Sequence, residues 1–272
     1  MRILAAPLLA AALALPAAAQ EQADPTFANP LLYAVAWKQT AAEYRALYHQ
    51  GFNVARMHVE AALAARKEGD RPLAVVTDMD DTILQPLEYW GHLVAQGIDF
   101  FDDPIWDSWI PTNGIVAAPG AREFLDFCAE NGVEVFYITS REQGENTYDY
   151  AMGHLKALGY PFADDDHLTV LRDTSNKEKK QDEIMERFEV VAFLGDNLND
   201  FRRKYYLKGD VDGRVAEMEA DRALFGTKYI VFPNPTDGHW MAAIFGESEP
   251  PATDENRAIL RDAAARTAWK GQ

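Results

Sequence analysis

Two short apolar segments, each followed closely by aspartates, constrain the fold of this 272-residue chain most strongly. The first leads into Asp78 and Asp80, and the second leads into Asp196 and Asp200. Short, continuous apolar runs of this kind are typical of strands that are buried on both faces of a parallel sheet. Ligands bind beyond the carboxyl ends of such strands. We therefore expect both acidic runs to meet at one edge of one sheet.

The order of the remaining segments predicts an α/β fold. Strands are expected at residues 73–76, 133–138, 168–171, 190–194 and 228–232. Helices are expected between them, at residues 120–131, at 146–158 and in a Lys-rich segment that ends at Phe188. Strands that alternate with helices indicate a Rossmann-like parallel sheet flanked by helices.

The segment before the first strand predicts a small helical subdomain. Apolar residues recur at helical spacing through residues 31–66, and Gly51 and Asn53 suggest a break between two helices. By contrast, residues 85–118 are long, aromatic and irregular, which favours a substrate-facing loop.

The chain is divided into four parts by composition. Residues 1–19 are predicted to be a signal peptide, because Arg2 precedes an apolar run that ends in small residues. An N-terminal helical segment that packs on the core (20–70), an α/β core (71–247) and a C-terminal tail (248–272), expected to be loosely held, follow. We expect an exported protein that is soluble in the periplasm or outside the cell. No cysteine lies directly after the apolar run, so no lipid anchor is expected. The one cysteine of the chain, Cys128, cannot form an intramolecular disulfide.

The net charge restricts the partners. The formal charge is −17 at pH 7, which repels nucleic acid and anionic membranes. The same charge gives an anionic substrate no long-range attraction, so a bound cation and local basic groups would have to supply it. We therefore expect a small-molecule partner and no nucleic-acid polymer. The oligomeric state is open, and a homodimer is among the expectations.

The spacing of the acids favours phosphoryl transfer. Asp78 and Asp80 lie two residues apart, so both can turn towards one bound group where the strand ends. One can attack phosphorus, and the other can protonate the leaving oxygen. Asp196 and Asp200 lie four residues apart, which is compatible with a turn that points both at one cation. Mg²⁺, a hard cation that prefers oxygen ligands, is the expected cofactor.

Other uses of these acids fail on residue type. A calcium-binding EF-hand loop that starts at Asp78 would need glycine and glutamate where the chain has Ile83 and Tyr89. The histidines show no spacing typical of zinc ligands. A serine-nucleophile elbow and a phosphate-cradling Gly-rich loop are both absent from the sequence.

Several motifs together resemble one family, the class C acid phosphatases, which are secreted bacterial members of the haloacid dehalogenase superfamily. Besides the two acidic runs, the motifs lie at residues 36–44, 119–124, 136–141, 175–177 and 233–234. This resemblance implies that Asp78 is the nucleophile and Asp80 the acid/base, whose backbone carbonyl also reaches Mg²⁺. It makes Asp196 a metal ligand and has Asp200 hold metal-bound water.

The resemblance also implies phosphate-binding residues. Thr139 stands where the family places a hydroxyl on the phosphate, and Lys177 where a lysine balances the charge of an aspartyl phosphate. Ser140 replaces the asparagine that is usual beside the phosphate.

The expected substrate pocket departs from the family. Tyr89, Phe101 and Trp106 supply aromatic surface, whereas Asp237 replaces a tyrosine of the aromatic wall that surrounds the base in nucleotidase members. Hydrolysis of nucleoside monophosphates, as in a 5′-nucleotidase, is therefore expected alongside that of simple aryl phosphates, with only a modest preference for either.

These observations predict a secreted, Mg²⁺-dependent acid phosphatase. Two alternatives stay open at this stage. A phosphotransferase would pass the phosphoryl group from the same intermediate to an alcohol. The other alternative is a non-catalytic binding or storage protein on the same fold, against which the retained Asp78, Asp80, Asp196, Asp200 and Lys177 argue.

Overall fold

The computed structural model describes residues 29–271, and the predicted signal peptide lies outside this range. Its core is a five-stranded sheet in the order β5-β4-β1-β6-β7, and every pair of neighbours is parallel. The strands are β1 (Leu73–Thr77), β4 (Glu134–Ser140), β5 (Leu168–Leu171), β6 (Glu189–Gly195) and β7 (Tyr229–Val231). The predicted parallel α/β fold is confirmed, and each strand falls on an apolar run identified in the sequence.

Successive residues of the central strands enter different cores, because side chains alternate between the faces of a sheet. In β1, Leu73 and Val75 pack in one core and Ala74 and Val76 in the other. The first core is covered by α2 (Ala42–Ala65), α5 (Ala121–Glu130) and α6 (Thr147–Ala157). The second is covered by α7 (Glu178–Arg187) and the 3-10 turns η3 (Leu198–Asp200), η4 (Arg203–Tyr205) and η5 (Arg222–Leu224). Two covered faces explain why the strands read as continuous apolar runs.

The predicted helix break at Gly51 and Asn53 is wrong. Helix α1 (Leu31–Thr40) ends at Ala41, whose backbone is extended, and α2 then continues through Gly51. A Cβ on Gly51 would lie 2.6 Å from the ring of Phe232, so this glycine allows α2 to approach the sheet closely. Close packing, and not a helix end, accounts for it.

The segment 85–118 is mostly helical and not irregular. It contains α3 (Leu87–Ala95), α4 (Asp103–Trp109) and the 3-10 turn η2 (Ile110–Thr112), between the paired strands β2 (Leu84–Gln85) and β3 (Val116–Ala117). Helices α1, α3 and α4 share a third apolar core that includes Val35, Trp90 and Trp106. The small helical subdomain is therefore built from α1, α3 and α4, whereas α2 belongs to the main core.

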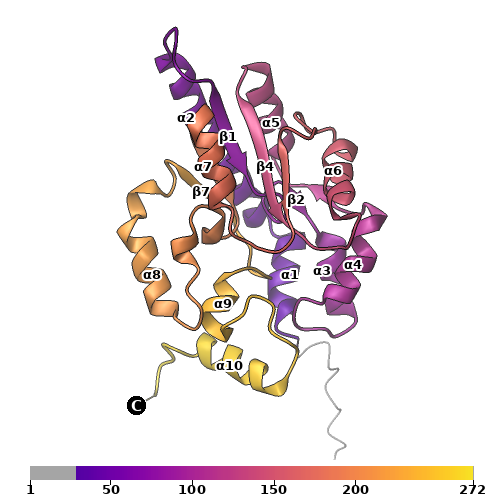
Figure 1. The fold of residues 1–272 in the computed structure, drawn as a ribbon. Coiled ribbons are helices and arrows are strands. Elements are labelled where there is room, and N and C mark those ends of the chain that lie inside the picture. The colour runs from indigo at the N-terminus through magenta and orange to yellow at the C-terminus, as the bar shows by residue number, and fades with distance from the viewer. Residues whose placement is uncertain (1–28, 272) are drawn as a thin grey trace, which may run out of the picture.

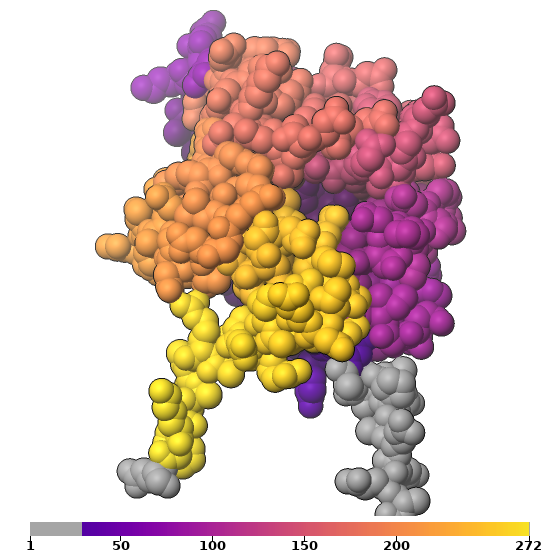
Figure 2. Space-filling view, turned by 60° about the horizontal axis from the view of Figure 1, so that its bottom comes forward, coloured from indigo at the N-terminus to yellow at the C-terminus, as the bar shows by residue number. Residues whose placement is uncertain are grey.

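The C-terminal region closes the same end of the molecule. Helix α8 (Val211–Ala220) follows β6, and helices α9 (Trp240–Phe245) and α10 (Asp254–Ala264) follow β7. Figure 1 shows α1, α3, α4 and α9 grouped at one end of the sheet. Figure 2 shows the C-terminal segment (yellow) between the region of α8 (orange) and that of α3 and α4 (magenta).

The described part of the predicted tail, residues 248–271, contains helix α10. Its helix α10 is tied to the subdomain by Arg257, whose Nε lies 2.5 Å from Oδ2 of the buried Asp99. None of the helices formed by residues 29–271 is long and apolar enough to cross a bilayer.

Candidate functional site

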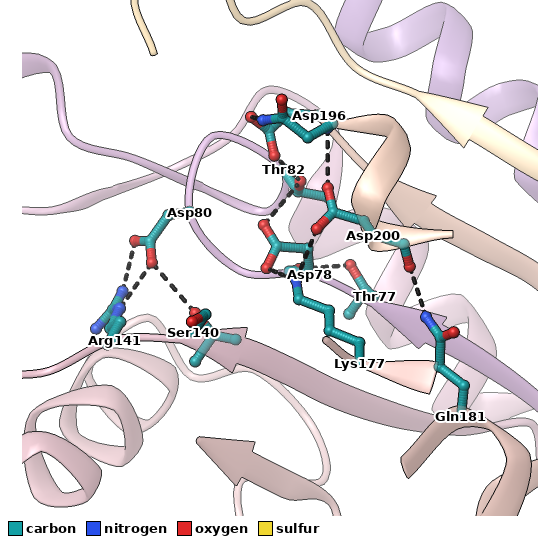
Figure 3. A network of polar contacts seen from close by, with 12 residues as sticks. Thr77, Asp78, Asp80, Thr82, Ser140, Arg141, Lys177, Gln181, Asp196 and Asp200 are labelled. Carbon is teal, nitrogen blue, oxygen red and sulfur yellow. Dashed lines mark hydrogen bonds and ion pairs between the residues drawn. The ribbon is translucent and has the colours of Figure 1, made fainter. Parts of the chain in front are cut away.

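Three aspartates converge where β1 and β6 end. Asp78 follows β1, Asp196 follows β6, and Asp200 lies in the turn η3. One carboxylate oxygen from each lies within 4.8 Å of the others. Because β1 and β6 are hydrogen-bonded neighbours, their carboxyl ends bring the two acidic runs together (Figure 3).

One ammonium group holds two of these carboxylates. Lys177, at the start of α7, donates to Asp78 Oδ1 and, at 2.8 Å, to Asp200 Oδ1. The lysine is almost fully buried, with 5% of its surface exposed, so these acids are its main polar environment. Burial alone would lower the pKa of Lys177, but Asp200 and Asp78 raise it above its ordinary value. Lys177 therefore stays protonated.

Amide groups hold the third aspartate, Asp196, and also bind the second oxygen of Asp200. Oδ2 of Asp196 accepts hydrogen bonds from the side chains of Asn197 at 2.6 Å and Asn234 at 2.7 Å. Oδ2 of Asp200 accepts from the backbone N–H of Asn197 at 2.8 Å. A Cβ on Gly195 would lie 2.4 Å from Cβ of Asp200, so the chain needs glycine there to let η3 fold back. Among residues 29–271, Oδ1 of Asp196 has only a 3.4 Å contact with the Thr82 hydroxyl.

The cluster fits a divalent cation. Three carboxylates face one ammonium group, which leaves two negative charges when all are ionised. Burial, only partly offset by Lys177, raises the pKa of Asp78 to about 7, and Asp200 adds to the rise. Burial and the neighbouring Asp200 likewise raise the pKa of Asp196 well above its ordinary value. A bound cation supplies the opposite charge that these crowded oxygens lack.

Asp80 belongs to a separate ion pair. Arg141 donates to its carboxylate through Nη2 at 2.5 Å and Nε at 2.7 Å. Burial alone would raise the pKa of Asp80, but Arg141 outweighs it and lowers that pKa. His154 accepts from Arg141 at 2.9 Å through Nδ1, and its Nε2 lies 3.2 Å from the carbonyl of Ile110. Burial, reinforced by Arg141, lowers the pKa of His154 to about 4, so the ring is neutral and supports Arg141 as an acceptor.

The two predicted hydroxyl residues end β4 beside Asp80. Thr139 is buried, and its Oγ1 lies 3.4 Å from Oδ2 of Asp80. Ser140 is exposed and donates to the carbonyl of Thr174 at 3.1 Å. Both line the same cavity as Asp78 and Lys177, so they face the space where a bound group would lie.

Several polar residues near the site, among them Lys38, Thr236 and Arg141, were not predicted as part of it. Lys38 of α1 is buried against Asp81, at 2.6 Å, and Thr236, at 2.9 Å. Thr236 in turn donates to Asn234, the residue that holds Asp196. Asp81 has a left-handed backbone, with φ of 52°. Lys38 therefore connects the turn at Asp81 to the loop that contains Thr236. Arg141 could have been suspected from its place directly after Ser140, but the partners of Lys38 are 43 and 198 residues away.

Two adjoining cavities open at this end of the sheet. The inner cavity, of about 160 Å³, is lined by the aspartate cluster, Lys177, Thr139 and Ser140. The outer cavity, of about 300 Å³, includes Phe101 and Trp106. Asp80, Asp81, Ser140, Asp237 and Glu249 line both, so the two cavities lie side by side.

The structure brings three of the four predicted substrate-pocket residues to these cavities. Phe101, Trp106 and Asp237 line the outer one, but Tyr89 does not. Tyr89 is fully buried behind the wall, its ring packs on Trp106, and its hydroxyl bonds to the backbone of Asp102. Its place is in the core of the helical subdomain.

Comparison with known proteins gives a family and a fold. A family model described as "HAD superfamily, subfamily IIIB (Acid phosphatase)" matches residues 11–240. The chain is also similar to two solved structures of the class C acid phosphatase from Bacillus anthracis, one of them with tungstate bound. Identity is 31% in both, covering 91% of this chain and 99% of that chain, with TM-scores of 0.79 and 0.80.

Proposed function

The chain belongs to the acid phosphatases of subfamily IIIB of the HAD superfamily, and we propose that it hydrolyses phosphate monoesters through an aspartyl phosphate on Asp78 with Mg²⁺ bound. The convergence of Asp78, Asp196 and Asp200 around Lys177 carries this proposal. It offers a nucleophile, oxygen ligands and a fixed positive charge within one cavity.

In the first half of the reaction, a carboxylate oxygen of Asp78 attacks phosphorus. The bond to the ester oxygen breaks, Asp80 gives that oxygen a proton, and the alcohol leaves. Because Arg141 favours the carboxylate form of Asp80, Asp80 must first take this proton from the substrate monoanion or from solvent. Asp80 faces both cavities, so it lies between the attacked phosphate and the leaving group. Its pairing with Arg141 keeps the carboxylate oriented before the substrate arrives.

In the second half, water attacks phosphorus in the aspartyl phosphate. Asp80 takes the proton of that water, phosphate is released and Asp78 is regenerated. Lys177 keeps its positive charge beside Asp78 throughout, so it stabilises the charge on the transferring group. Thr139 and Ser140 are in place to hydrogen-bond the phosphate oxygens.

The residues that would hold Mg²⁺ are Asp78, Asp196 and the backbone carbonyl of Asp80, with Asp200 holding metal-bound water. When bound, the ion would supply positive charge next to the transferring phosphoryl group. Oδ1 of Asp196 supports this assignment, because among residues 29–271 no close hydrogen bond occupies it.

We also propose that the protein is exported after removal of residues 1–19, and that nucleoside monophosphates are among its substrates.

The test is hydrolysis of p-nitrophenyl phosphate by purified protein, with Mg²⁺ and after exhaustive chelation. Asp78→Asn keeps the size of the side chain and removes the attacking charge, so kcat should fall by about four orders of magnitude or more, as when other enzymes lose a nucleophile. Asp107→Asn, an exposed acid outside both cavities, is the matched control. Near-normal activity in Asp78→Asn, or activity that survives chelation, would contradict the proposal.

A further inference from the structure

The outer cavity is lined by six carboxylates, and three of them already have cationic partners. Asp80 pairs with Arg141, Asp81 with Lys38, and Glu142 with Arg172. The other three, among the residues that the structure describes, form no ion pair. They are Asp103, Asp237 and Glu249. Since both arginines of the lining are occupied, this side of the cavity carries uncompensated negative charge.

Aromatic rings line the same cavity. Phe101 and Trp106 contribute to its wall. Trp90 lies behind them, only 1% exposed, and Nζ of Lys38 already lies 5.5 Å from the centroid of its ring. The ring centroids of Phe101 and Trp106 lie 5.6 Å apart, and both rings pack on the buried ring of Tyr89. This packing holds the two rings in place. Faces of aromatic rings attract organic cations as well as apolar groups. Carboxylates beside aromatic faces therefore favour a ligand that is both cationic and apolar.

The unpaired carboxylates lie where a leaving group would be. Asp237 and Glu249 line the inner cavity as well as the outer one, so they border the space next to the attacked phosphate. Asp237 is fixed by its own backbone, whose carbonyl accepts from the indole of Trp240 at 2.8 Å. Burial raises the pKa of Asp237 to about 7, and the nearby Glu249 and Asp81 add to the rise. Without a bound cation, Asp237 is therefore about half ionised at pH 7, and a cationic ligand beside it would favour the carboxylate form.

The geometry of the three acids is unsuited to a bare metal ion. Within residues 29–271, the group of acids whose oxygens come within 4.8 Å of one another is Asp78, Asp196 and Asp200, and no such group forms from the acids of the outer cavity. Carboxylates that surround a space without converging on a point match a larger cation, with its charge spread over several atoms.

We propose that the outer cavity selects phosphate monoesters whose leaving alcohol carries an alkylammonium group, such as the phosphates of amino alcohols. This inference rests on the proposed function and names the substrate class of the same site. The phosphate enters the inner cavity beside Lys177, and the ammonium group lies between Asp237, Glu249 and the aromatic wall. Leaving groups that carry further negative charge are repelled from this space.

The test compares two substrates that differ only in charge. Choline phosphate and 3,3-dimethylbutyl phosphate have the same shape, but the second has carbon in place of the ammonium nitrogen. The wild type should prefer choline phosphate by at least about tenfold in kcat/KM, because only the ammonium group gains from ion pairing and from contact with the aromatic rings. Asp237→Asn and Glu249→Gln should each lower the ratio of the two kcat/KM values about threefold or more, whatever either variant does to the hydrolysis of the neutral ester.

The control is Asp107→Asn, which removes the same charge from the same helix as Asp103 without lining the cavity. Its preference should equal that of the wild type, and circular dichroism of each variant checks the fold. An equal kcat/KM for both esters in the wild type, or no effect of either cavity variant, overturns the inference.

A second measurement separates this inference from the proposed function. Choline itself should bind the protein more tightly than 3,3-dimethylbutanol in calorimetry, and Asp237→Asn should remove the difference. If p-nitrophenyl phosphate is not hydrolysed, the proposed function fails, and this comparison alone decides the inference. If p-nitrophenyl phosphate is hydrolysed but choline binds no better than its neutral analogue, the inference alone fails.

Discussion

At the level of single residues, Lys177 joins the two halves of the aspartate cluster. Its ammonium group contacts one acid from the loop after β1 and another from η3. Lys177→Met would leave both carboxylates facing each other without compensation and would remove a fixed charge from the phosphate site. We expect kcat on p-nitrophenyl phosphate to fall by about 10²–10³-fold, the usual cost of one preorganised charge-stabilising donor.

Lys180→Met is the control for that experiment. Lys180 lies one turn further along α7, with 34% of its side chain exposed, and pairs only with Glu183 at 3.7 Å. A loss of similar size in both variants would assign the effect to the helix instead of the Lys177 ammonium group.

Asp80 gives a prediction about leaving groups. Asp80→Asn cannot donate or take the proton, so esters with poor leaving groups should suffer most. The ratio of kcat/KM for p-nitrophenyl phosphate to that for an alkyl phosphate should rise at least about tenfold in the variant. Equal losses on the two esters would argue against the acid role and would leave Asp80 as the partner that orients Arg141.

Sequence reasoning worked for residues that are marked by their neighbours along the chain. Asp78 and Asp196 directly follow buried strands, and the structure has them at adjacent strand ends. Lys38 lacks such a signal, because its role depends on contacts with Asp81 and Thr236 that exist only after folding. Local sequence indicates where a strand ends, but it does not indicate which distant helix supplies a buried counter-charge.

At the level of elements, α2 depends on one glycine. Gly51→Ala should raise the helix propensity by about 1 kcal/mol but force its Cβ against the ring of Phe232, at a cost of about 1–3 kcal/mol. We expect a net loss of stability, measured as a lower urea midpoint or a melting temperature lower by a few degrees.

Gly153→Ala in α6 is the matched control, because a Cβ there meets nothing within 4 Å. It should leave stability unchanged or raise it by up to about 1 kcal/mol. If Gly51→Ala stabilises the protein as much as Gly153→Ala does, close packing against Phe232 is not the reason for this glycine.

The same glycine shows why elements were predicted unevenly. Strands were found because two buried faces demand continuous apolar runs. The break between α1 and α2 was misplaced because a glycine inside a helix reads in sequence like a helix end. Helices α3 and α4 were missed because their apolar residues serve a separate small core and are interrupted by Gly97 and Pro104, which obscures the helical period.

At the level of the whole molecule, His154 links stability to pH. Burial and Arg141 lower its pKa from 6.5 to about 4 in the folded protein. Between these two values the unfolded chain binds a proton at this residue and the folded chain does not. The free energy of unfolding should therefore fall as the pH falls from 6.5 towards 4, by up to about 3 kcal/mol from this residue.

His154→Asn tests this, because its side-chain oxygen can accept from Arg141 and does not titrate. The variant should lose less stability than the wild type over the same pH range, measured by urea unfolding with Mg²⁺ present. Parallel stability curves for the two proteins would show that protonation of His154 does not contribute.

The single thiol of the chain, Cys128 on α5, is fully buried in the first core, beneath α2, α5 and α6. Burial raises its pKa to about 12. A thiol-directed reagent can modify it only in molecules whose α5 has left the sheet. The rate of labelling therefore reports how often α5 opens. Each molecule can be labelled once, at its natural cysteine, so no probe has to be introduced. Any cation or ester that binds at the far end of the sheet and stabilises the closed form would lower the rate of Cys128 labelling. The dependence of that rate on ligand concentration would measure the affinity of the ligand.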